Sequence, residues 1–472
     1  MGIRNQKILL CLLLTIQFFL VAGYAYYHKY YWSQDVLRVV YLDPGRDMTG
    51  LSPYGPGLDR ELAEYFSAWS GLKSVWISAD SFPEAISMVQ SGRAHLFIPG
   101  PHDMAGEWED ISRGPQYMSS RLIIAHNQWR YPLRSMDDLC EVEVVVPRSP
   151  VFSSKISRLE QDLECSIDLN LVQDPGKEFF NLLSNRDFRF GLVDEQSFNL
   201  WHGFFPEVHK TYDFGTDYGH AWIWNNRFED MHRILTGFWE EMARDSLLSD
   251  LEDRYFGFFP PEKDPYQIRH FIRALEDRLP LYMEFIIEAS LEYNIDPLLL
   301  TALIYQESHF DPQARSRTGV RGLLQITRDT ADFLGMQDRL DPGQSITGGA
   351  KYLNFLLEHV EETGAGSWDK WFFTLAAYNQ GLGHLYDAMT LARRKEKNHL
   401  SWAQVKEVYP LLSYKRYFET LPRGYARGFE AVIFVDNIRY YYYLLHSMIS
   451  LSRPEVEHLA GLSGLVPAGW PD

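Results

Sequence analysis

The chain has 472 residues, a formal net charge of −18 at pH 7, 46% hydrophobic residues and three cysteines. This length suits two or three domains, and this apolar content is that of a folded protein rather than a disordered one. The negative charge argues against a nucleic-acid partner, because phosphate binding needs a basic surface.

Residues 1–33 form a predicted targeting segment. A basic start is followed by an apolar run from Ile8 to about Tyr27, which approaches the roughly 20 residues that span a bilayer. The positive charges before the run predict export of everything that follows it. A small-x-small pattern at Gly23–Ala25 leaves two alternatives open, a cleaved signal peptide and a retained signal anchor.

Residues 34–260 alternate between strand and helix signals. Such alternation predicts an α/β architecture with a mainly parallel sheet. The expected strands are Leu37–Leu42, Val75–Ser78, His95–Ile98, Leu122–Ala125, Val142–Val146, Ile167–Val172, Phe190–Val193 and His220–Trp224. The expected helices are Leu58–Trp69, Phe82–Gln90, one through Ile156 and Leu163, and one around Phe179–Leu183. The strands at 122–125 and 220–224 are expected to cross between two halves of the domain.

Cys140 and Cys165 are the two cysteines of the exported part, and each comes just before an expected strand. Neighbouring parallel strands would bring the two thiols together, so an oxidising compartment would allow a disulfide between them. Two isolated buried thiols are the alternative. No cysteine or histidine spacing indicates a metal site.

This first domain resembles the extracellular solute-binding family that carries amino acids to transporters. The resembling pieces are LRVVYL, GPGLDRELAEYFSAWSGLK, AISMVQSGRAHLFIPG and NLLSNRDFRFGLVDEQS. The resemblance implies two lobes around a ligand cleft. It departs at the family's carboxylate-clamping Arg, where this chain has Glu107 and Trp108, and Arg113 is only a late candidate. The ligand is therefore expected not to be a free amino acid; an empty scaffold is the alternative.

The segment FGFFPPEKD, residues 256–264, marks the predicted boundary to an all-α domain at residues 261–451. Its proline pair and charges are typical of a linker. Residues 452–472 contain Gly and Pro and are expected to form a weakly ordered tail. The expected helices are Ile268–Arg278, Leu281–Tyr293, Pro297–Ser308, Thr330–Leu334, Ser345–Val360, Trp368–Tyr378 and Phe429–Leu445.

Glu307 is expected near the end of a mostly apolar helix that begins at Asp296. Asp is a good helix N-cap, and Pro297 suits the first helical position. Burial of a carboxyl group raises its pKa, as a general acid working near neutral pH requires. A capping role or a surface ion pair is the alternative for Glu307 when it is considered alone.

Several short motifs follow this helix in a fixed order. They are GVRGLLQIT, SITGGAKYL, AAYNQGLGHLYDA, YPLLS and GYARGFEAVIFVDNIRYYYY. Together with YQESHFDP they resemble the lytic transglycosylases with a goose-lysozyme-like catalytic domain, which carry ES, GLMQ and AAYNxG motifs in this order. More narrowly they resemble the membrane-bound lytic murein transglycosylase F type, which also joins a solute-binding-like domain to the catalytic one.

This resemblance implies a reaction and a set of site residues. The reaction is non-hydrolytic cleavage of the MurNAc–GlcNAc β-1,4 bond of murein, which gives 1,6-anhydroMurNAc ends and needs neither metal nor cofactor. Glu307 would be the catalytic acid, while the residues expected in the substrate groove are Ser308, Gln325, Tyr378, Asn379 and Tyr440. Ser308 as a helix C-cap and Gln325 as a turn stabiliser are the structural alternatives. Many members of the family have Tyr where this chain has Phe434, and Tyr440 could supply the hydroxyl that is missing there.

The resemblance also implies partners and a location. The partners are peptidoglycan glycan strands and a membrane. A peptide or muropeptide that binds in the first domain and modulates the second is a separate hypothesis, which comes from the two-lobed pattern without the carboxylate clamp. The location is the periplasm, at the outer membrane, or at the inner membrane if the N-terminal segment is retained. Two rival functions remain: a muramidase that uses water, and a solute or wall receptor with an inactive helical domain.

Overall fold

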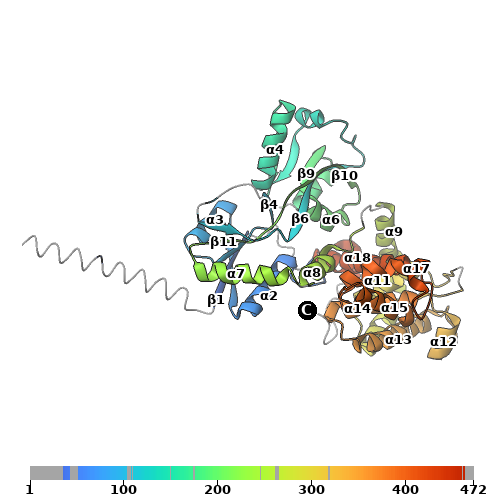
Figure 1. Cartoon of the computed structure of the whole chain (residues 1–472). Coiled ribbons are helices and arrows are strands. Elements are labelled where there is room, and N and C mark those ends of the chain that lie inside the picture. The colour runs from blue at the N-terminus through green and yellow to red at the C-terminus, as the bar shows by residue number, and fades with distance from the viewer. Residues whose placement is uncertain are drawn as a thin grey trace, which may run out of the picture.

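The computed structural model describes residue 17 and residues 36–42, 51–103, 108, 110–148, 150–173, 176–244, 246–260, 265–316, 319–459 and 461–462. Figure 1 shows two α/β lobes and a separate helical domain, with α8 (Leu247–Phe256) lying between them. The predicted targeting segment lies outside the described residues, apart from Gln17. Among the described residues, no helix combines the length and the apolar composition needed to cross a bilayer.

Lobe 1 is built on a five-stranded sheet with the order β2-β1-β3-β11-β5. Strand β1 pairs in parallel with both of its neighbours, β2 and β3. The strands are β1 (Val36–Leu42), β2 (Lys73–Ala79), β3 (Leu96–Ile98), β5 (Ile111–Arg113) and β11 (Ile223–Asn225), and the helices are α2 (Leu58–Ser70), α3 (Phe82–Gln90) and α7 (Glu229–Met242). Helix α2 ends at Gly71, which is left-handed with φ 72°.

Lobe 2 is built on a six-stranded sheet with the order β4-β10-β6-β9-β7-β8. The long antiparallel pair of β6 (Met118–Asn127) and β10 (Val208–His220) forms its centre, so the predicted strand at 122–125 is the middle of β6. The other elements are β4 (Pro101–Asp103), η1 (Met136–Glu141), β7 (Val144–Pro147), α4 (Pro150–Leu163), β8 (Leu169–Val172), α5 (Lys177–Ser184), β9 (Phe190–Asp194) and α6 (Glu195–His202). The prediction of a two-lobed α/β domain is thus confirmed. The expectation of a mainly parallel sheet is wrong, because β4, β6, β10 and β11 pair antiparallel with their neighbours and make both sheets mixed.

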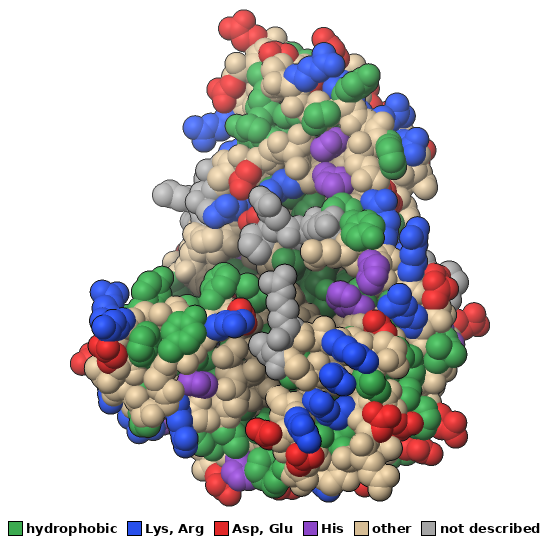
Figure 2. Space-filling model, turned by 90° about the vertical axis from the view of Figure 1, so that its right-hand side faces the viewer, with side chains coloured by type: hydrophobic (Ala, Val, Ile, Leu, Met, Phe, Trp, Pro, Cys, Tyr) green, Lys and Arg blue, Asp and Glu red, His purple; other side chains and the backbone are tan. Residues whose placement is uncertain are grey.

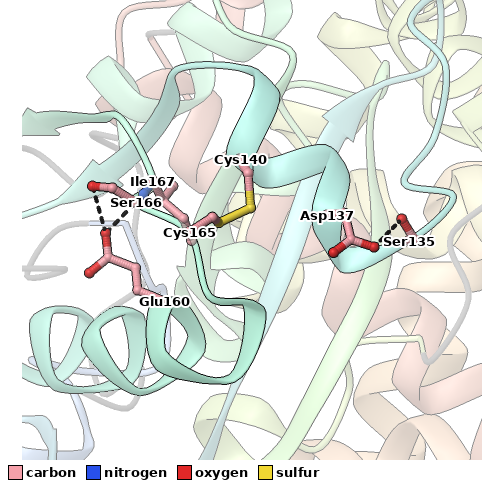
Figure 3. The surroundings of a disulfide bond; sticks show 7 residues. All are labelled: Ser135, Asp137, Cys140, Glu160, Cys165, Ser166 and Ile167. Atoms are coloured by element: carbon pink, nitrogen blue, oxygen red, sulfur yellow. Dashed lines mark hydrogen bonds between the residues drawn. A yellow bond between two sulfur atoms is a disulfide. The ribbon is translucent and has the colours of Figure 1, made fainter.

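A disulfide joins Cys140 to Cys165 within lobe 2. Figure 3 shows Cys140 at the end of η1 and Cys165 just after α4, next to Ile167. The two cysteines precede β7 and β8, which pair in parallel as expected, and their Cα atoms are 6.1 Å apart. The chain therefore contains the disulfide that the sequence left open.

Replacing Cys140 and Cys165 together by Ser should destabilise lobe 2 by about 3 kcal/mol, because the crosslink closes a loop of 25 residues in the unfolded chain. Chemical denaturation with and without a reductant measures the effect. The reductant should weaken the native chain and leave the double variant unchanged. Equal unfolding midpoints for the two proteins would contradict this expectation.

The C-terminal part is helical, as the sequence predicts, and it contains three further helices that were not predicted, α15 to α17. Its helices are α9 (Pro265–Asp277), α10 (Met283–Tyr293), α11 (Pro297–Ser308), α12 (Arg328–Leu334), α13 (Pro342–Glu361), α14 (Ser367–Gln380), α15 (Leu382–Arg394), α16 (Trp402–Val408), α17 (Lys415–Phe418) and α18 (Gly428–Ser450), with short 3-10 segments η2 (Leu279–Leu281), η3 (Tyr409–Ser413) and η4 (Pro454–Leu459). Residues 261–264, at the predicted domain boundary, lie outside the described residues.

The expectation of a weakly ordered tail is wrong for residues 454–459 and 461–462. η4 turns back onto the domain, and the side chains of Val456, Leu459 and Leu462 are buried. Burial of these three apolar side chains provides the free energy that holds the segment against the domain. Residues 463–472 lie outside the described part of the chain.

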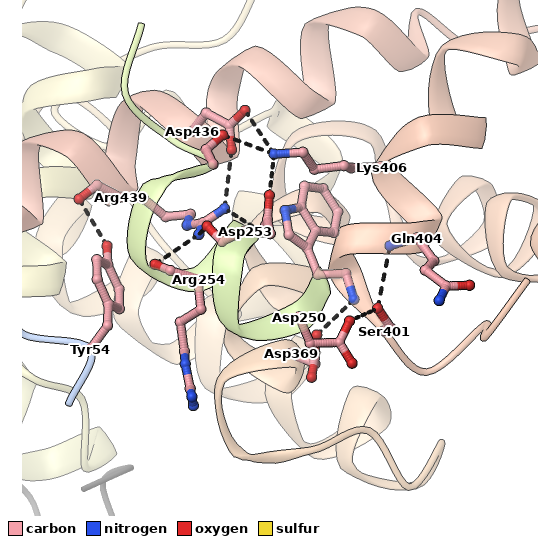
Figure 4. Close-up of polar contacts among 12 residues, drawn as sticks. Tyr54, Asp250, Asp253, Arg254, Asp369, Ser401, Gln404, Lys406, Asp436 and Arg439 are labelled. Carbon is pink, nitrogen blue, oxygen red and sulfur yellow. Dashed lines mark hydrogen bonds and ion pairs between the residues drawn. The ribbon is translucent and has the colours of Figure 1, made fainter. Parts of the chain in front are cut away.

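A buried cluster of charges joins α8 to α16 and α18 (Figure 4). The guanidinium of Arg439, 1% exposed, donates to Asp253 Oδ2 at 3.0 Å and to Asp436 Oδ1 at 3.2 Å. Lys406 pairs with the same two carboxylates. Burial acts to raise the pKa of Asp253, but Arg439 and Lys406 outweigh it and hold this pKa below its usual value. Such paired charges fix α8 against the helical domain.

Both lobes also contact α18 directly. The Tyr54 hydroxyl, just before α2, donates to the Arg439 carbonyl at 2.8 Å, and the Ser447 hydroxyl donates to the Leu51 carbonyl at 2.7 Å. From the other side, the Tyr443 hydroxyl donates to the Leu200 carbonyl of α6 at 2.9 Å. The central helix of the C-terminal domain is therefore covered by the N-terminal domain along much of its length.

Candidate active site

Helix α11 carries Glu307 in its last turn. Asp296 caps the helix as predicted, since its side chain accepts from the backbone N–H groups of Leu298 and Leu299. The helix is buried from Pro297 to Tyr305, whereas Glu307 is half-buried. Immediately beyond it, His309 and Phe310 are both left-handed, with φ 51° and 57°. This sharp turn ends α11 just after Glu307. Strained backbone of this kind is common at active sites.

The surroundings of Glu307 keep its carboxyl group neutral near neutral pH. Burial raises the pKa of Glu307 from 4.5 to about 8. Burial is the only cause found, so no other charged side chain in the described part of the chain contributes to this shift. Since the residue remains half-buried rather than fully buried, a substrate can still reach the protonated carboxyl. These are the properties of a general acid.

The loop between α11 and α12 depends on Gly322 and Gln325. Gly322 has φ +83°, and a Cβ atom there would lie 1.9 Å from the Arg339 carbonyl oxygen. Gln325 is left-handed, with φ 46°, and its side-chain nitrogen donates to the carbonyls of Ala314 at 3.0 Å and Gly322 at 2.8 Å. The side-chain nitrogen of Gln325 therefore stabilises the loop, which is the structural alternative given for this residue. The side-chain oxygen of Gln325 can still accept a hydrogen bond from a ligand.

Helix α13 supports the same loop through small residues. A Cβ atom at Gly349 would lie 2.2 Å from Leu324, so the loop packs directly on the helix backbone. The Ser345 hydroxyl accepts from the Leu324 N–H at 3.3 Å. The motif SITGGAKYL thus holds the loop in position. Leu324, which stands where the GLMQ motif has Met, packs against Gly349.

Tyr378 connects the loop, α14 and the acid. Its hydroxyl donates to the Leu324 carbonyl at 2.8 Å, one residue before Gln325. Burial raises the pKa of Tyr378 well above its usual value, and the nearby Glu307 carboxylate raises it further. The structure therefore brings together Glu307, Tyr378 and the Gln325 loop, three elements that are far apart in the sequence.

Two other predicted groove residues take different positions. Asn379 is exposed at the end of α14, beside Gly381, and its Oδ1 atom accepts from Gln380 at 2.7 Å. Ser308 is buried, and its hydroxyl donates back to the Ile304 carbonyl of its own helix at 3.1 Å. Asn379 can thus reach a ligand directly, whereas the Ser308 proton is used inside α11.

The structure places Tyr440 away from the predicted groove. Its ring is buried 6.0 Å from that of Phe259, and its hydroxyl lies 2.9 Å from the position of a Cβ atom at Gly203 in lobe 2. Tyr440 therefore packs between the domains, because that face of α18 is covered by the N-terminal domain. The assignment of Tyr440 to the substrate groove is not supported.

Tyr352 is a neighbour of the site that sequence reasoning did not single out. It lies on α13, and its ring centroid is 5.6 Å from that of Tyr378. Burial raises the pKa of Tyr352, so its hydroxyl stays protonated. Tyr352 lies three residues after Gly349, which contacts the loop, so the two residues share one face of α13. This spacing is the sequence signal that could have identified Tyr352 as a neighbour of the site.

Replacing Gly322 by Ala should cost more than about 2 kcal/mol and lower the activity, because the new Cβ would add a backbone clash to the left-handed strain. Gly319→Ala is the matched control. Gly319 has φ +89° but open space around it, so its replacement should cost only about 1 kcal/mol. Unfolding curves of both variants make the comparison; equal losses would show that the Arg339 contact is unimportant.

Known proteins are similar to this chain over most of its length. Residues 284–401 match the family described as "Transglycosylase SLT domain". A protein of Alkalilimnicola ehrlichii named membrane-bound lytic murein transglycosylase F 2 is 35% identical, over 82% of this chain and 85% of its own length. Proteins named membrane-bound lytic murein transglycosylase F from Shewanella halifaxensis and Salmonella arizonae are 32% and 31% identical, over 88% and 93% of this chain and 88% and 85% of their own lengths.

Solved structures similar to this chain cover about half of it. The substrate-binding protein of an amino acid ABC transporter is 16% identical with a TM-score of 0.41, covering 47% of this chain and 99% of that protein. An ancestral arginine-binding protein is 17% identical with a TM-score of 0.42, covering 48% of this chain and 99% of that protein.

Proposed function

Because the chain belongs to the membrane-bound lytic murein transglycosylase F family, we propose that Glu307 is both the acid and the base with which this lytic transglycosylase cleaves murein. One observation carries the assignment. The half-buried Glu307 carboxyl has a pKa of about 8 and lies close enough to Tyr378 to raise the pKa of that residue.

Glu307 acts twice in the proposed reaction. Its neutral carboxyl first donates a proton to the glycosidic oxygen as the C1–O bond breaks, and the substrate's own N-acetyl group supports the anomeric carbon. The resulting carboxylate then accepts the proton of the C6 hydroxyl, whose oxygen bonds to C1. No water is consumed, and Glu307 ends protonated as it began. A single acid suffices here, whereas most glycosidases use two.

The residues around Glu307 are proposed to bind the glycan strand. The Gln325 amide oxygen and the exposed Asn379 amide offer hydrogen bonds to N-acetyl or hydroxyl groups. Tyr378 holds the Gln325 loop against α14 through its bond to the Leu324 carbonyl. Ser308 is proposed to support α11 rather than to contact the sugar.

The products of murein digestion test this function against its hydrolytic rival. Mass spectrometry of the released muropeptides should find 1,6-anhydro ends, which weigh one water less than the ends that a muramidase leaves. Products that contain the additional water would show that the enzyme is a hydrolytic muramidase and not a lyase. A complete absence of cleavage would favour a wall receptor with an inactive helical domain.

Stability should fall as the pH rises from about 4.5 towards 8, and activity should fall as the pH rises through about 8. Glu307 must be protonated to donate, and its pKa lies near 8, so the rate should decline above that pH. The folded chain holds this proton more tightly than the unfolded chain, whose glutamate has a pKa near 4.5. This contribution to stability is therefore complete below pH 4.5 and lost as the pH rises towards 8. Rates and unfolding midpoints from pH 4 to 10 measure both trends, and Glu307→Gln should lack the stability trend.

We further propose that a wall-derived peptide or muropeptide binds in the cleft between the two lobes and modulates the catalytic domain. The support is a two-lobed fold whose expected carboxylate clamp is missing, joined to the catalytic domain through α8 and Arg439. Titration of the whole chain with wall peptides, followed by calorimetry and by the rate of murein cleavage, tests this role. Binding without any change of rate would leave the first domain as a spacer.

Export and membrane attachment are proposed from the N-terminal sequence and from the names of the relatives, which are membrane-bound. We place the protein in the periplasm at the outer membrane if the segment is cleaved. A retained segment would hold it at the inner membrane. Cell fractionation together with the mass of the mature N-terminus distinguishes the two.

A further inference from the structure

A cavity of about 540 Å³ lies where lobe 2 meets the helical domain. Lobe 2 contributes the ends of β6 and α5 and the loop before β10, and the helical domain contributes α9 and the segment after α18. None of the lining residues belongs to the motifs around Glu307. The volume is typical of small-molecule sites, and boundaries between domains are common places for them.

Positive charge dominates the lining of this cavity, although the chain as a whole is acidic at −18. Three arginines, Arg186, Arg269 and Arg453, face a single acid, Glu207, which already accepts from the Ser184 hydroxyl. Within the described ranges of the chain, no ion pair involves Arg186 or Arg269. Figure 2 shows basic side chains on this side of the molecule, along the line where the upper lobe meets the lower domain. Guanidinium groups favour carboxylates, which they bind through two parallel hydrogen bonds.

The wall of the cavity on lobe 2 is preformed. Asn127, 0% exposed, donates through Nδ2 to the carbonyls of Leu183 and Ser184 at 3.1 and 3.0 Å, which ties the end of β6 to the end of α5. The Gln128 backbone N–H donates to the Glu207 carbonyl at 2.7 Å. A ligand would therefore meet a rigid surface and lose little free energy in ordering it.

The cavity is also crossed by hydrogen bonds between the two domains. Arg269 on α9 donates to the Gln128 side chain at 3.3 Å, and Arg453 donates to the Phe204 carbonyl at 3.4 Å. Both are long and can be exchanged for charged bonds to a ligand. A bound anion would then hold arginines of the helical domain and Arg186 of lobe 2 at the same time.

Trp129 adds an apolar surface at the rim. Its side chain is 66% exposed, which is unusual for so large an aromatic residue. An exposed indole beside arginines can stack on a sugar ring or on the aliphatic part of a peptide. The lining thus combines a site for carboxylates with a flat apolar contact.

We infer that this cavity binds a small carboxylate-bearing ligand, which bridges lobe 2 and the helical domain. The chemistry fits two sources, an acidic peptide and a carboxylated sugar. The inference is separate from the assignment of Glu307, because binding at the cavity requires no cleavage.

Calorimetry on the whole chain tests the inference with three probes: the dipeptide L-alanyl-D-glutamate, N-acetylmuramic acid, and uncharged N-acetylglucosamine as the control. At least one of the two charged probes should bind, and the one that binds identifies the source. Replacing Arg186 and Arg269 together by Gln should weaken that binding tenfold or more, because each charged hydrogen bond contributes about one order of magnitude. Arg273→Gln is the matched control, since Arg273 is an exposed residue on the same helix α9 that does not line the cavity.

A second readout reports on the cavity itself. Binding should change the tryptophan fluorescence of the native chain, and Trp129→Ala should remove that change. Because Trp129 is exposed, we expect this variant to fold. Circular dichroism confirms that each variant is folded. The inference is overturned if neither charged probe binds at millimolar concentration. It is also overturned if the Arg186 and Arg269 double variant binds as tightly as the native chain, which would place the ligand elsewhere.

Discussion

Replacing Glu307 by Gln should lower the rate of murein cleavage by about 10²- to 10⁴-fold and leave murein binding intact. Glutamine has nearly the shape of the protonated acid, so α11 and the loop that carries Gln325 should keep their positions. It cannot give up a proton, and the loss of a general acid typically costs two to four orders of magnitude. Release of soluble muropeptides measures the rate, and co-sedimentation with insoluble murein measures the binding.

Asp311→Asn is the matched control for this experiment. Asp311 is the next acid along the chain, but it is exposed and its Oδ1 atom accepts from the Gln313 N–H at 2.9 Å, a turn contact that Asn can keep. We expect this variant to cleave at nearly the native rate. If Glu307→Gln released muropeptides as fast as Asp311→Asn, Glu307 would not be the acid.

Replacing Arg439 by Met should destabilise the whole chain by about 3–5 kcal/mol, the usual loss when one partner of a buried ion pair is removed. The change would leave the carboxylates of Asp253 and Asp436 with Lys406 as their remaining cation. It would also remove the guanidinium that lies 4.2 Å from the ring centroid of Phe372. Denaturant unfolding of the native and variant chains measures the loss.

The domains should also unfold more independently in this variant, because Arg439 connects α8 to α18. Arg427→Met is the control: Arg427 lies at the start of the same helix in an exposed pair with Glu430, and its loss should cost less than about 1 kcal/mol. Equal midpoints for the two variants would mean that the buried cluster contributes little to the joint between the domains.

Local signals predicted the helix that carries Glu307 because its stabilising contacts are local. The Asp296 cap, the proline at the first turn and the apolar run lie within a dozen residues, and the structure contains each of them. Helix α6 was missed because no turn signal separates it from the strand before it. Asp194 ends β9 and also caps α6, accepting from the Ser197 N–H at 2.8 Å, so no loop separates the two elements in the sequence.

The errors around the site come from long-range packing. Tyr440 lies in a helix that is apolar on most sides, and its periodicity cannot tell which face meets the substrate and which meets lobe 2. The role of Gln325 depends on the Ala314 carbonyl, which the folded loop brings to 3.0 Å. Motif order pointed to segments that the fold brings together around Glu307, but only the folded structure shows which atoms of these side chains are already used.

The position of the disulfide makes the chain convenient for labelling. Cys140 and Cys165 are bonded to each other, and the third cysteine, Cys11, lies in the predicted targeting segment. Residues 166–472 contain no cysteine. A single cysteine introduced on the surface of the helical domain would therefore accept a maleimide dye or a spin label without competition from a neighbour. Thiol-directed poisons, for the same reason, have no side chain to attack in the catalytic half of the molecule.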